Sequence, residues 1–208
     1  MDIKTFPIGP LETNCHVATN GSSAIAVDVG GEPSAVAQYL KERGLSLEAV
    51  LVTHLHCDHI YGVGELAREF GATIFAGAED APLMETDLGR GGFMGLPLVP
   101  AFTWEPLGPG EISLLGQPCR VLATPGHSAG SRSYYFPQAD VVFVGDLIMY
   151  RSVGRTDFPG GDFDALMRSV REGIFTLPEN TMILSGHGLA TTVGDEMRHN
   201  PFFSEYTG

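Results

Sequence analysis

The sequence is poor in basic residues relative to acidic ones. Its 208 residues include 12 Lys and Arg against 25 Asp and Glu, which gives a formal net charge of −13 at pH 7. This acidic excess argues against binding to phosphate backbones or anionic lipid, because the overall field of the protein repels both. We therefore expect a small molecule as the partner, and neither nucleic acid nor a membrane.

Cysteine and long apolar runs are also scarce. The three cysteines, Cys15, Cys57 and Cys119, are odd in number and form no CxxC pair, so a disulfide framework is not expected. No run of about 18 apolar residues occurs, as a membrane span would need. The N-terminal MDIKTFPIGP lacks the basic and apolar regions of a signal peptide. Together these absences predict a protein of the reducing cytoplasm.

The length and a hydrophobic content of 43% fit one domain, residues 1–208, that buries its own core. Short apolar runs bounded by turn signals predict strands at residues 15–19, 24–29, 50–53, 73–76, 120–123, 133–136, 141–144 and 181–184. Helical spacing predicts helices at 33–43, 63–70 and 163–174, the last with Asp162 as its N-cap. The mixture indicates sheets covered by helices.

The segment 78–116 shows no clear period. It is rich in Gly, Pro and isolated aromatic residues, including Trp104. Long irregular segments of compact domains form lids, binding loops or ordinary surface loops. The pattern leaves these alternatives open.

Five of the seven histidines lie in three short motifs, THLHCDH at 53–59, TPGH at 124–127 and SGHG at 185–188. Each motif follows the end of a predicted strand, and VVFVGD at 141–146 likewise ends a strand in a carboxylate. Loops at strand ends commonly form sites. His16 and His199 have no such motif, and we interpret them as ordinary polar residues with hydrogen-bond partners.

Imidazole and carboxylate ligands suit zinc, with iron or manganese as alternatives. A period of two would direct His54, His56 and Asp58 to one side, with His59 turned toward a second centre and Cys57 pointing away into packing. The ligands suffice for two divalent ions. One ion would take His54, His56 and His127, the other Asp58, His59 and His187, with Asp146 bridging them.

These motifs, in this order, resemble the metallo-β-lactamase superfamily and most closely its glyoxalase II-like branch of small single-domain hydrolases. The segments GPLETNC at 9–15, SVGRTDFPGG at 152–161 and RHNPF at 198–202 resemble the same branch. The resemblance implies an αββα sandwich of two mixed sheets covered by helices, and a dinuclear centre held by the same seven residues. Cysteine-ligand β-lactamases would have Cys in place of Asp146, and flavodiiron proteins Glu in place of His56.

The expected reaction is hydrolysis of a thioester of the S-2-hydroxyacylglutathione type. Two ions sharing Asp146 would lower the pKa of a bound water toward about 7, and Asp58 would also orient the resulting hydroxide. The resemblance implies that Arg155 contacts glutathione. Asp28 would either hydrogen-bond a ligand histidine or serve a structural turn. Against glutathione recognition, the chain has Leu189 where larger glyoxalase II enzymes have Tyr.

Three other functions remain open from the sequence. A persulfide dioxygenase would bind one iron through His54, His127 and Asp146. GHSAG at 126–130 matches the GxSxG of serine hydrolases, with Ser128, Asp146 and His187 as the triad. Metal-dependent binding without turnover is the third. The sequence does not predict the oligomeric state.

Overall fold

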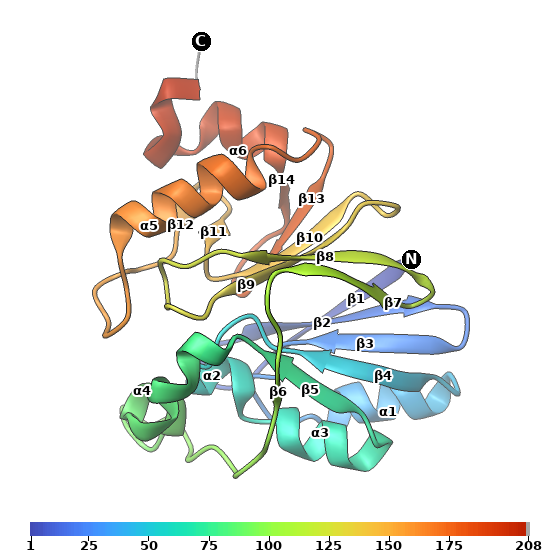
Figure 1. Ribbon diagram of the computed structural model, residues 1–208. Helices are drawn as coiled ribbons and strands as arrows, with labels where there is room; N and C mark the ends of the chain where they lie inside the picture. The colour runs from blue at the N-terminus through green and yellow to red at the C-terminus, as the bar shows by residue number, and fades with distance from the viewer. Residues whose placement is uncertain (207–208) are drawn as a thin grey trace.

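Two six-stranded β-sheets lie face to face in the computed structural model, with helices on both outer faces (Figure 1). This is the αββα sandwich that the sequence predicted. The structure describes residues 1–206, so positions 207–208 of the predicted domain lie outside the described residues. No helix in the described part of the chain is long and apolar enough to cross a membrane.

The first sheet has the strand order β1-β2-β3-β4-β5-β6. Pairing is antiparallel from β1 to β3 and parallel from β3 to β6. Helices α1 and α3 cover its outer face (Figure 1). The elements are β1 (Asp2–Ile8), β2 (Thr13–Asn20), β3 (Ser23–Val27), α1 (Ser34–Glu42), β4 (Ser46–Leu51), α2 (Cys57–Ile60), α3 (Val63–Phe70), β5 (Thr73–Ala76), a 3₁₀ helix (Ala78–Glu85), α4 (Asp87–Arg90) and β6 (Glu105–Pro106).

The second sheet has the order β14-β13-β10-β9-β8-β7, with β10 and β13 parallel and the other pairs antiparallel. Helices α5 and α6 lie over its outer face (Figure 1). The elements are β7 (Gly110–Leu114), β8 (Gln117–Ala123), β9 (Arg132–Phe136), β10 (Val141–Gly145), β11 (Ile148–Met149), β12 (Ser152–Val153), α5 (Phe163–Arg168), a π helix (Ser169–Ile174), β13 (Met182–Ser185), β14 (Thr191–Thr192), α6 (Val193–His199) and a 3₁₀ helix (Pro201–Tyr206).

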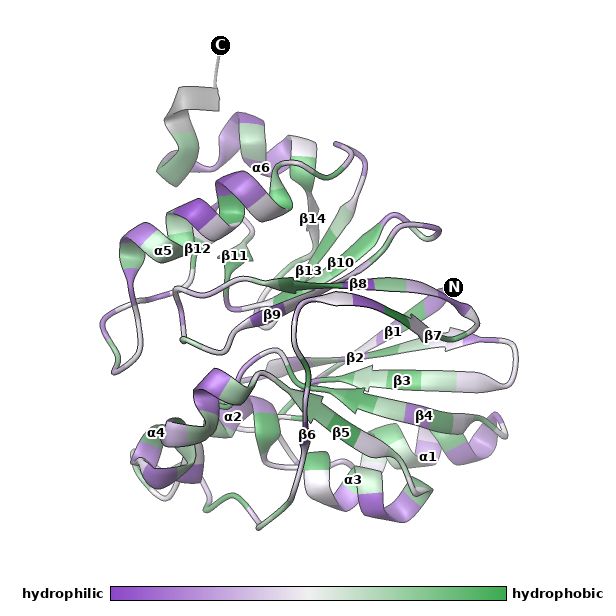
Figure 2. Ribbon diagram, in the orientation of Figure 1, coloured by the Kyte–Doolittle hydropathy of each residue, from purple (hydrophilic) through white to green (hydrophobic). Residues whose placement is uncertain are grey.

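Strand alternation divides the buried side chains among three apolar layers. On β3, Ile25 packs between the sheets whereas Ala26 packs toward the helices. On β10, Phe143 packs between the sheets and Val142 toward the helices. Because both faces of these strands are covered, they are apolar along most of their length rather than alternating, as Figure 2 shows for β5 and β10. This explains why continuous apolar runs marked the strands in the sequence.

All eight predicted strands and all three predicted helices are present, with shifts at their ends. Asp162 caps α5 as predicted, since its side chain accepts a hydrogen bond from the Ala165 amide. The segment 78–116 is not irregular throughout, because it contains a 3₁₀ helix, α4, β6 and β7. Strand β7 lies at a sheet edge, and its alternation is only four residues long, with exposed Glu111 and Ser113 between half-buried Ile112 and buried Leu114.

Candidate metal centre

Four strands deliver the predicted ligands to one end of the sandwich. In the second sheet β8, β10 and β13 run in the same direction, and their carboxyl ends precede His127, Asp146 and His187. In the first sheet β4 leads into His54. Parallel strands end at the same edge, so side chains far apart in the sequence meet there.

The structure brings all seven predicted ligands together. Their donor atoms fall into three sets whose members lie within 4.8 Å of one another: His54, His56 and His127; His54, His59 and Asp146; and Asp58, His59 and His187. The first and third sets are the two predicted ligand groups. His56 Nδ1 and His127 Nε2 are 3.0 Å apart in the first, and Asp58 Oδ2 lies 3.3 Å from His187 Nε2 in the third.

Asp146 lies between these two groups. Its Oδ2 is 3.7 Å from His127 Nε2 and 3.7 Å from His187 Nε2, and its Oδ1 is 3.5 Å from His59 Nε2. One carboxylate thus reaches donors of both groups. This is the position that a bridging ligand requires.

Unpartnered buried atoms show that cations fit this site. His54 Nε2, His59 Nε2 and Asp146 Oδ1 are buried and have no hydrogen-bond partner. Leaving such atoms unpaired away from water costs about 1–3 kcal/mol each, whereas a divalent cation would satisfy several at once. Imidazole nitrogen and carboxylate oxygen are suitable donors for zinc, iron and manganese alike.

The opposite ring nitrogens are already engaged, which leaves the inward nitrogens free. His54 Nδ1 contacts Thr53 Oγ1 at 3.1 Å, and His127 Nδ1 contacts the Arg155 carbonyl oxygen at 2.7 Å. His59 Nδ1 contacts Asp28 Oδ2 at 2.8 Å. Such outer contacts fix the ring orientation of metal-binding histidines.

The pKa values of the histidines in the site are shifted in opposite directions. Burial lowers the pKa of His54, and burial together with His127 lowers that of His56 to about 3, so both are neutral at pH 7 with free lone pairs. Burial also opposes protonation of His59, but the carboxylates of Asp146, Asp58 and Asp28 outweigh it and raise its pKa to about 10. The carboxylates therefore favour positive charge at this position.

Asp28 fulfils both roles that the sequence left open. It follows β3 with a positive φ of 54°, and its carboxylate accepts hydrogen bonds from the Thr53 amide at 2.8 Å and the Thr53 hydroxyl at 2.7 Å. The same carboxylate contacts His59. It thus joins the turn after β3 to the segment that carries His54.

We expect Asp28→Ala to weaken metal binding by about 10- to 100-fold, the usual cost of losing an outer partner of a ligand histidine. Competition with a chromophoric chelator measures this affinity. Asp164→Ala, which removes an exposed carboxylate on α5, is the matched control. An affinity within twofold of the unmodified chain would show that Asp28 does not support His59.

Sequence reasoning missed Asp80, which lies in the 3₁₀ helix of the segment 78–116. Its buried carboxylate accepts hydrogen bonds from the Leu55 amide at 3.1 Å, the Ser128 hydroxyl at 2.7 Å and the Gly130 amide at 2.6 Å. It therefore ties the loop of His54 and His56 to the loop of His127. No motif surrounds Asp80 in the sequence.

The structure does not support the serine triad that was weighed as an alternative. Ser128 is fully buried, and its hydroxyl contacts Asp80 at 2.7 Å and the Ser131 hydroxyl at 2.8 Å. His187 Nε2 instead faces Asp58 and Asp146. Ser128 is thus a structural partner of Asp80 and has no histidine base.

The predicted alternation of side chains, which would direct His54, His56 and Asp58 to one side, extends only as far as His56. Helix α2 begins at Cys57, so alternation ends there, and Asp58 joins His59 and His187 rather than the side of His54. Cys57 is buried and belongs to none of the ligand sets among the described residues, and burial raises its pKa to about 11. Its interpretation as a packing residue agrees with this placement.

The two isolated histidines are ordinary polar residues, as predicted. His16 is buried, with Nδ1 2.9 Å from Thr5 Oγ1 and Nε2 3.1 Å from the Ser185 carbonyl oxygen. His199 is exposed, and its Nδ1 lies 3.1 Å from the Asp195 carbonyl oxygen. Neither takes part in a ligand set of the described chain.

A cavity of about 500 Å³ opens onto the ligand sets. Arg155 lies at its border, where the guanidinium donates to Asp157 Oδ1 and Oδ2, both at 2.7 Å, and stacks 3.9 Å from the centroid of the Phe158 ring. The cavity is lined by Pro10, Leu11, His56, Cys57, Asp58, Leu88, Phe93, Met94, Leu96, His127, Asp146, Arg155, Phe158 and His187. Part of the segment 78–116 therefore borders the site.

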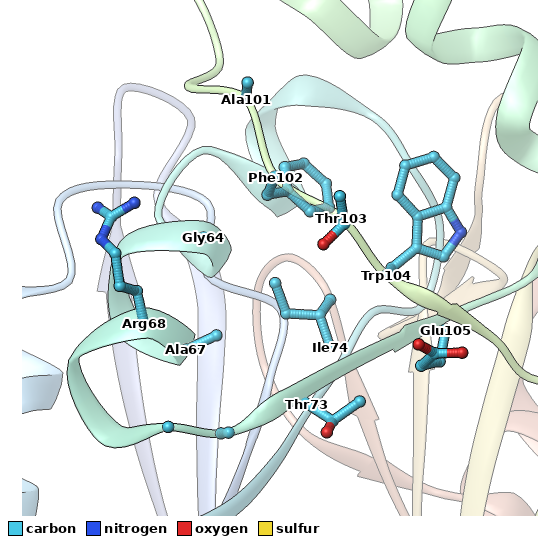
Figure 3. Close-up of a pocket in the computed structure, with 12 residues that line it drawn as sticks. Gly64, Ala67, Arg68, Thr73, Ile74, Ala101, Phe102, Thr103, Trp104 and Glu105 are labelled. Atoms are coloured by element: carbon cyan, nitrogen blue, oxygen red, sulfur yellow. The ribbon is translucent and has the colours of Figure 1, made fainter.

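A second hollow, of about 450 Å³, lies between α3, β5 and residues 101–105. Figure 3 shows Phe102 and Trp104 on the loop before β6 and Arg68 on α3. None of the metal-ligand sets of the described chain borders it. The cavity beside the histidines is therefore the candidate site.

Curated relatives match the chain along its whole length. It is 35% identical over 210 residues to "Probable metallo-hydrolase YqgX" of Bacillus subtilis, covering 100% of each chain. It is 33% identical over 209 residues to "Hydroxyacylglutathione hydrolase GloC" of Haemophilus influenzae, covering 98% of this chain and 99% of that protein.

Solved structures and a family model agree with these relatives. The fold matches the BLEG-1 B3 metallo-beta-lactamase with a TM-score of 0.91 and 36% identity, covering 98% of this chain and 100% of that one. It matches the di-iron-bound form of TTHA1623 with a TM-score of 0.86 and 36% identity, covering 96% and 99%. The sequence model of the metallo-beta-lactamase superfamily matches residues 8–187. With its histidines and aspartates gathered at the sheet ends, the chain belongs to the metallo-β-lactamase superfamily.

Proposed function

We propose that this protein hydrolyses thioesters at a centre of two divalent metal ions. The observation that carries the proposal is the position of Asp146 between two complete groups of ligands. The first group, His54, His56 and His127, would hold one ion, and the second, Asp58, His59 and His187, the other. Zinc is our first choice, with iron or manganese as alternatives.

When bound, such ions supply Lewis acidity that activates water and polarises a carbonyl group. The chain itself positions the reactants. Asp58 Oδ2, 3.3 Å from His187 Nε2, lies on the cavity lining and would orient the attacking water. A thiolate leaving group needs little protonation, so the reaction does not require a further acid from the chain.

A glutathione-derived thioester is the first substrate class to examine. The similarity to GloC supports it, and Arg155 borders the cavity, where it would meet a carboxylate of the substrate. Because Arg155 is paired with Asp157, a glutathione carboxylate would have to compete for it.

The test is thioester hydrolysis by the metal-loaded protein, with metal content measured on the same sample. Substrates are S-D-lactoylglutathione and acyl thioesters of N-acetylcysteamine, and released thiol is detected with a chromogenic disulfide. We expect two metal equivalents and turnover that a chelator abolishes. No turnover of any thioester at full loading would contradict the proposal. One iron per chain with oxygen uptake on glutathione persulfide would assign the dioxygenase reaction instead.

Metal removal is also expected to destabilise the fold. Because the ligands assemble only in the folded chain, metal at about 100 times its Kd stabilises it by about 2.7 kcal/mol. For a domain of this size each kcal/mol shifts Tm by about 2–4 °C. Calorimetry should therefore show Tm falling by about 5–10 °C after chelation. An unchanged Tm would indicate that the ligand groups hold no metal.

A further inference from the structure

The cavity beside the metal-ligand sets has a largely apolar wall. Pro10 and Leu11 contribute from the loop between β1 and β2, and Leu88 from α4. Phe93, Met94 and Leu96 follow α4 and complete the group, which we call the apolar wall.

Two members of this wall are unusually exposed. Leu11 is 51% exposed and Met94 is 91% exposed. Apolar side chains gathered around a cavity indicate a binding surface, because a bound apolar group removes them from water. Single exposed apolar residues occur on any surface, but these two border the same cavity as the catalytic carboxylate Asp58.

The charges of the cavity give a second, independent observation. Among the described residues that line it, Arg155 is the only Lys or Arg. One edge of its guanidinium, formed by Nε and Nη2, donates to Asp157, and its flat face covers the Phe158 ring. The carboxylates of Asp58 and Asp146 also line the cavity, but as proposed metal ligands their charge would be offset by that of the ions. Among these described residues, an anionic substrate therefore meets no Lys or Arg that lacks a carboxylate partner.

We infer that the site prefers thioesters with an uncharged, apolar chain, and that Asp157 is a specificity-determining residue because it holds Arg155. This inference rests on the proposed thioester hydrolysis and narrows its substrate class. Glutathione carries a net negative charge, and Asp157 already offsets the charge of Arg155, so a glutathione carboxylate gains less from this side chain than it would from an unpaired arginine. An apolar chain covers the apolar wall and does not depend on Arg155.

The first experiment varies charge and chain length separately. Acetyl, butyryl and hexanoyl thioesters of N-acetylcysteamine and of glutathione are compared with the metal-loaded protein. We expect kcat/KM to rise with chain length, by up to about fourfold per methylene when the chain is fully buried. At equal chain length, kcat/KM for the uncharged N-acetylcysteamine thioesters should exceed that for the glutathione thioesters by about tenfold, as expected for loss of one charge-assisted contact.

The second experiment releases Arg155. Asp157→Asn should raise kcat/KM for glutathione thioesters about tenfold relative to the uncharged series, and Arg155→Gln in the same chain should cancel this gain. Glu179→Gln is the matched control, because Glu179 is an exposed acid paired with Arg198 and lies outside the cavity lining. This variant makes the same change in net charge, so it tests whether overall charge alone alters the ratio of kcat/KM between the glutathione and the uncharged thioesters.

The third experiment truncates two side chains of the apolar wall. Phe93→Ala and Met94→Ala should reduce the dependence of kcat/KM on acyl chain length. The inference would be wrong if kcat/KM of the unmodified protein did not change with acyl chain length, or if the protein preferred glutathione thioesters. Either result would leave the proposed thioester hydrolysis intact. If Asp157→Asn and Glu179→Gln change the ratio of kcat/KM for glutathione thioesters to kcat/KM for uncharged thioesters equally, Asp157 does not determine specificity. Failure to hydrolyse any thioester would refute the proposed function and the inference together.

Discussion

Replacing Asp146 by Ala is expected to lower kcat/KM for thioester hydrolysis by at least about 10³-fold. Its carboxylate lies between both ligand groups, at 3.7 Å from His127 Nε2 and from His187 Nε2, so its loss removes a donor from each. A bound ion contributes several kcal/mol to stabilising the transition state, and each 1.36 kcal/mol is about tenfold in rate. Bound metal should fall from two equivalents toward one.

Metal analysis of Asp146→Ala, together with kcat/KM, provides the measurement. Asp164→Ala is the control, since it removes an exposed carboxylate on α5 and leaves the ligand sets intact. A bound ion is expected to contribute several kcal/mol to the rate. If Asp146→Ala still binds two equivalents of metal and keeps more than about a tenth of the original kcat/KM, Asp146 does not bridge the ions.

The second large effect is expected in stability. Asp80→Ala should lower the free energy of unfolding of the metal-free protein by about 3–5 kcal/mol. The change leaves three buried donors, the Leu55 amide, the Ser128 hydroxyl and the Gly130 amide, without their acceptor. Each orphaned donor costs about 1–3 kcal/mol, and water entering the vacated space recovers part of that cost.

Urea unfolding of the metal-free chain measures this effect without a contribution from metal binding. The companion variant Ser128→Ala removes one of the three partners and should cost less, about 1 kcal/mol. If Asp80→Ala unfolds at the same urea concentration as the parent chain, the carboxylate does not hold the two loops together.

The sheets and the ligand sets could be predicted from the sequence because their signals are local. Strands such as β5 and β10 are apolar on both faces, so each forms a continuous apolar run. His54, His127, Asp146 and His187 each come shortly after the end of a strand. The αββα architecture was predicted through the resemblance to a known family, which rests on the same motifs, and the structure confirms it.

The supporting role of Asp80 could not be predicted and that of Asp28 stayed open between two alternatives, because both roles depend on contacts between distant segments. Asp80 reaches Ser128 across 48 positions, and Asp28 reaches His59 across 31. The helical start at Cys57 ends the alternation that would have placed Asp58 beside His54 and His56, whereas its predicted grouping with His59 and His187 is what the structure shows. The engagement of Arg155 by Asp157 is short in sequence but depends on how the loop after β12 folds.

The ligands come from both halves of the sandwich. His54, His56, Asp58 and His59 follow β4 of the first sheet, whereas His127, Asp146 and His187 follow strands of the second. Neither half expressed alone would possess a full set of donors. A cation seated at their junction would act as a cross-link, so that one half could not open without releasing it, and the two halves should melt in a single step when loaded.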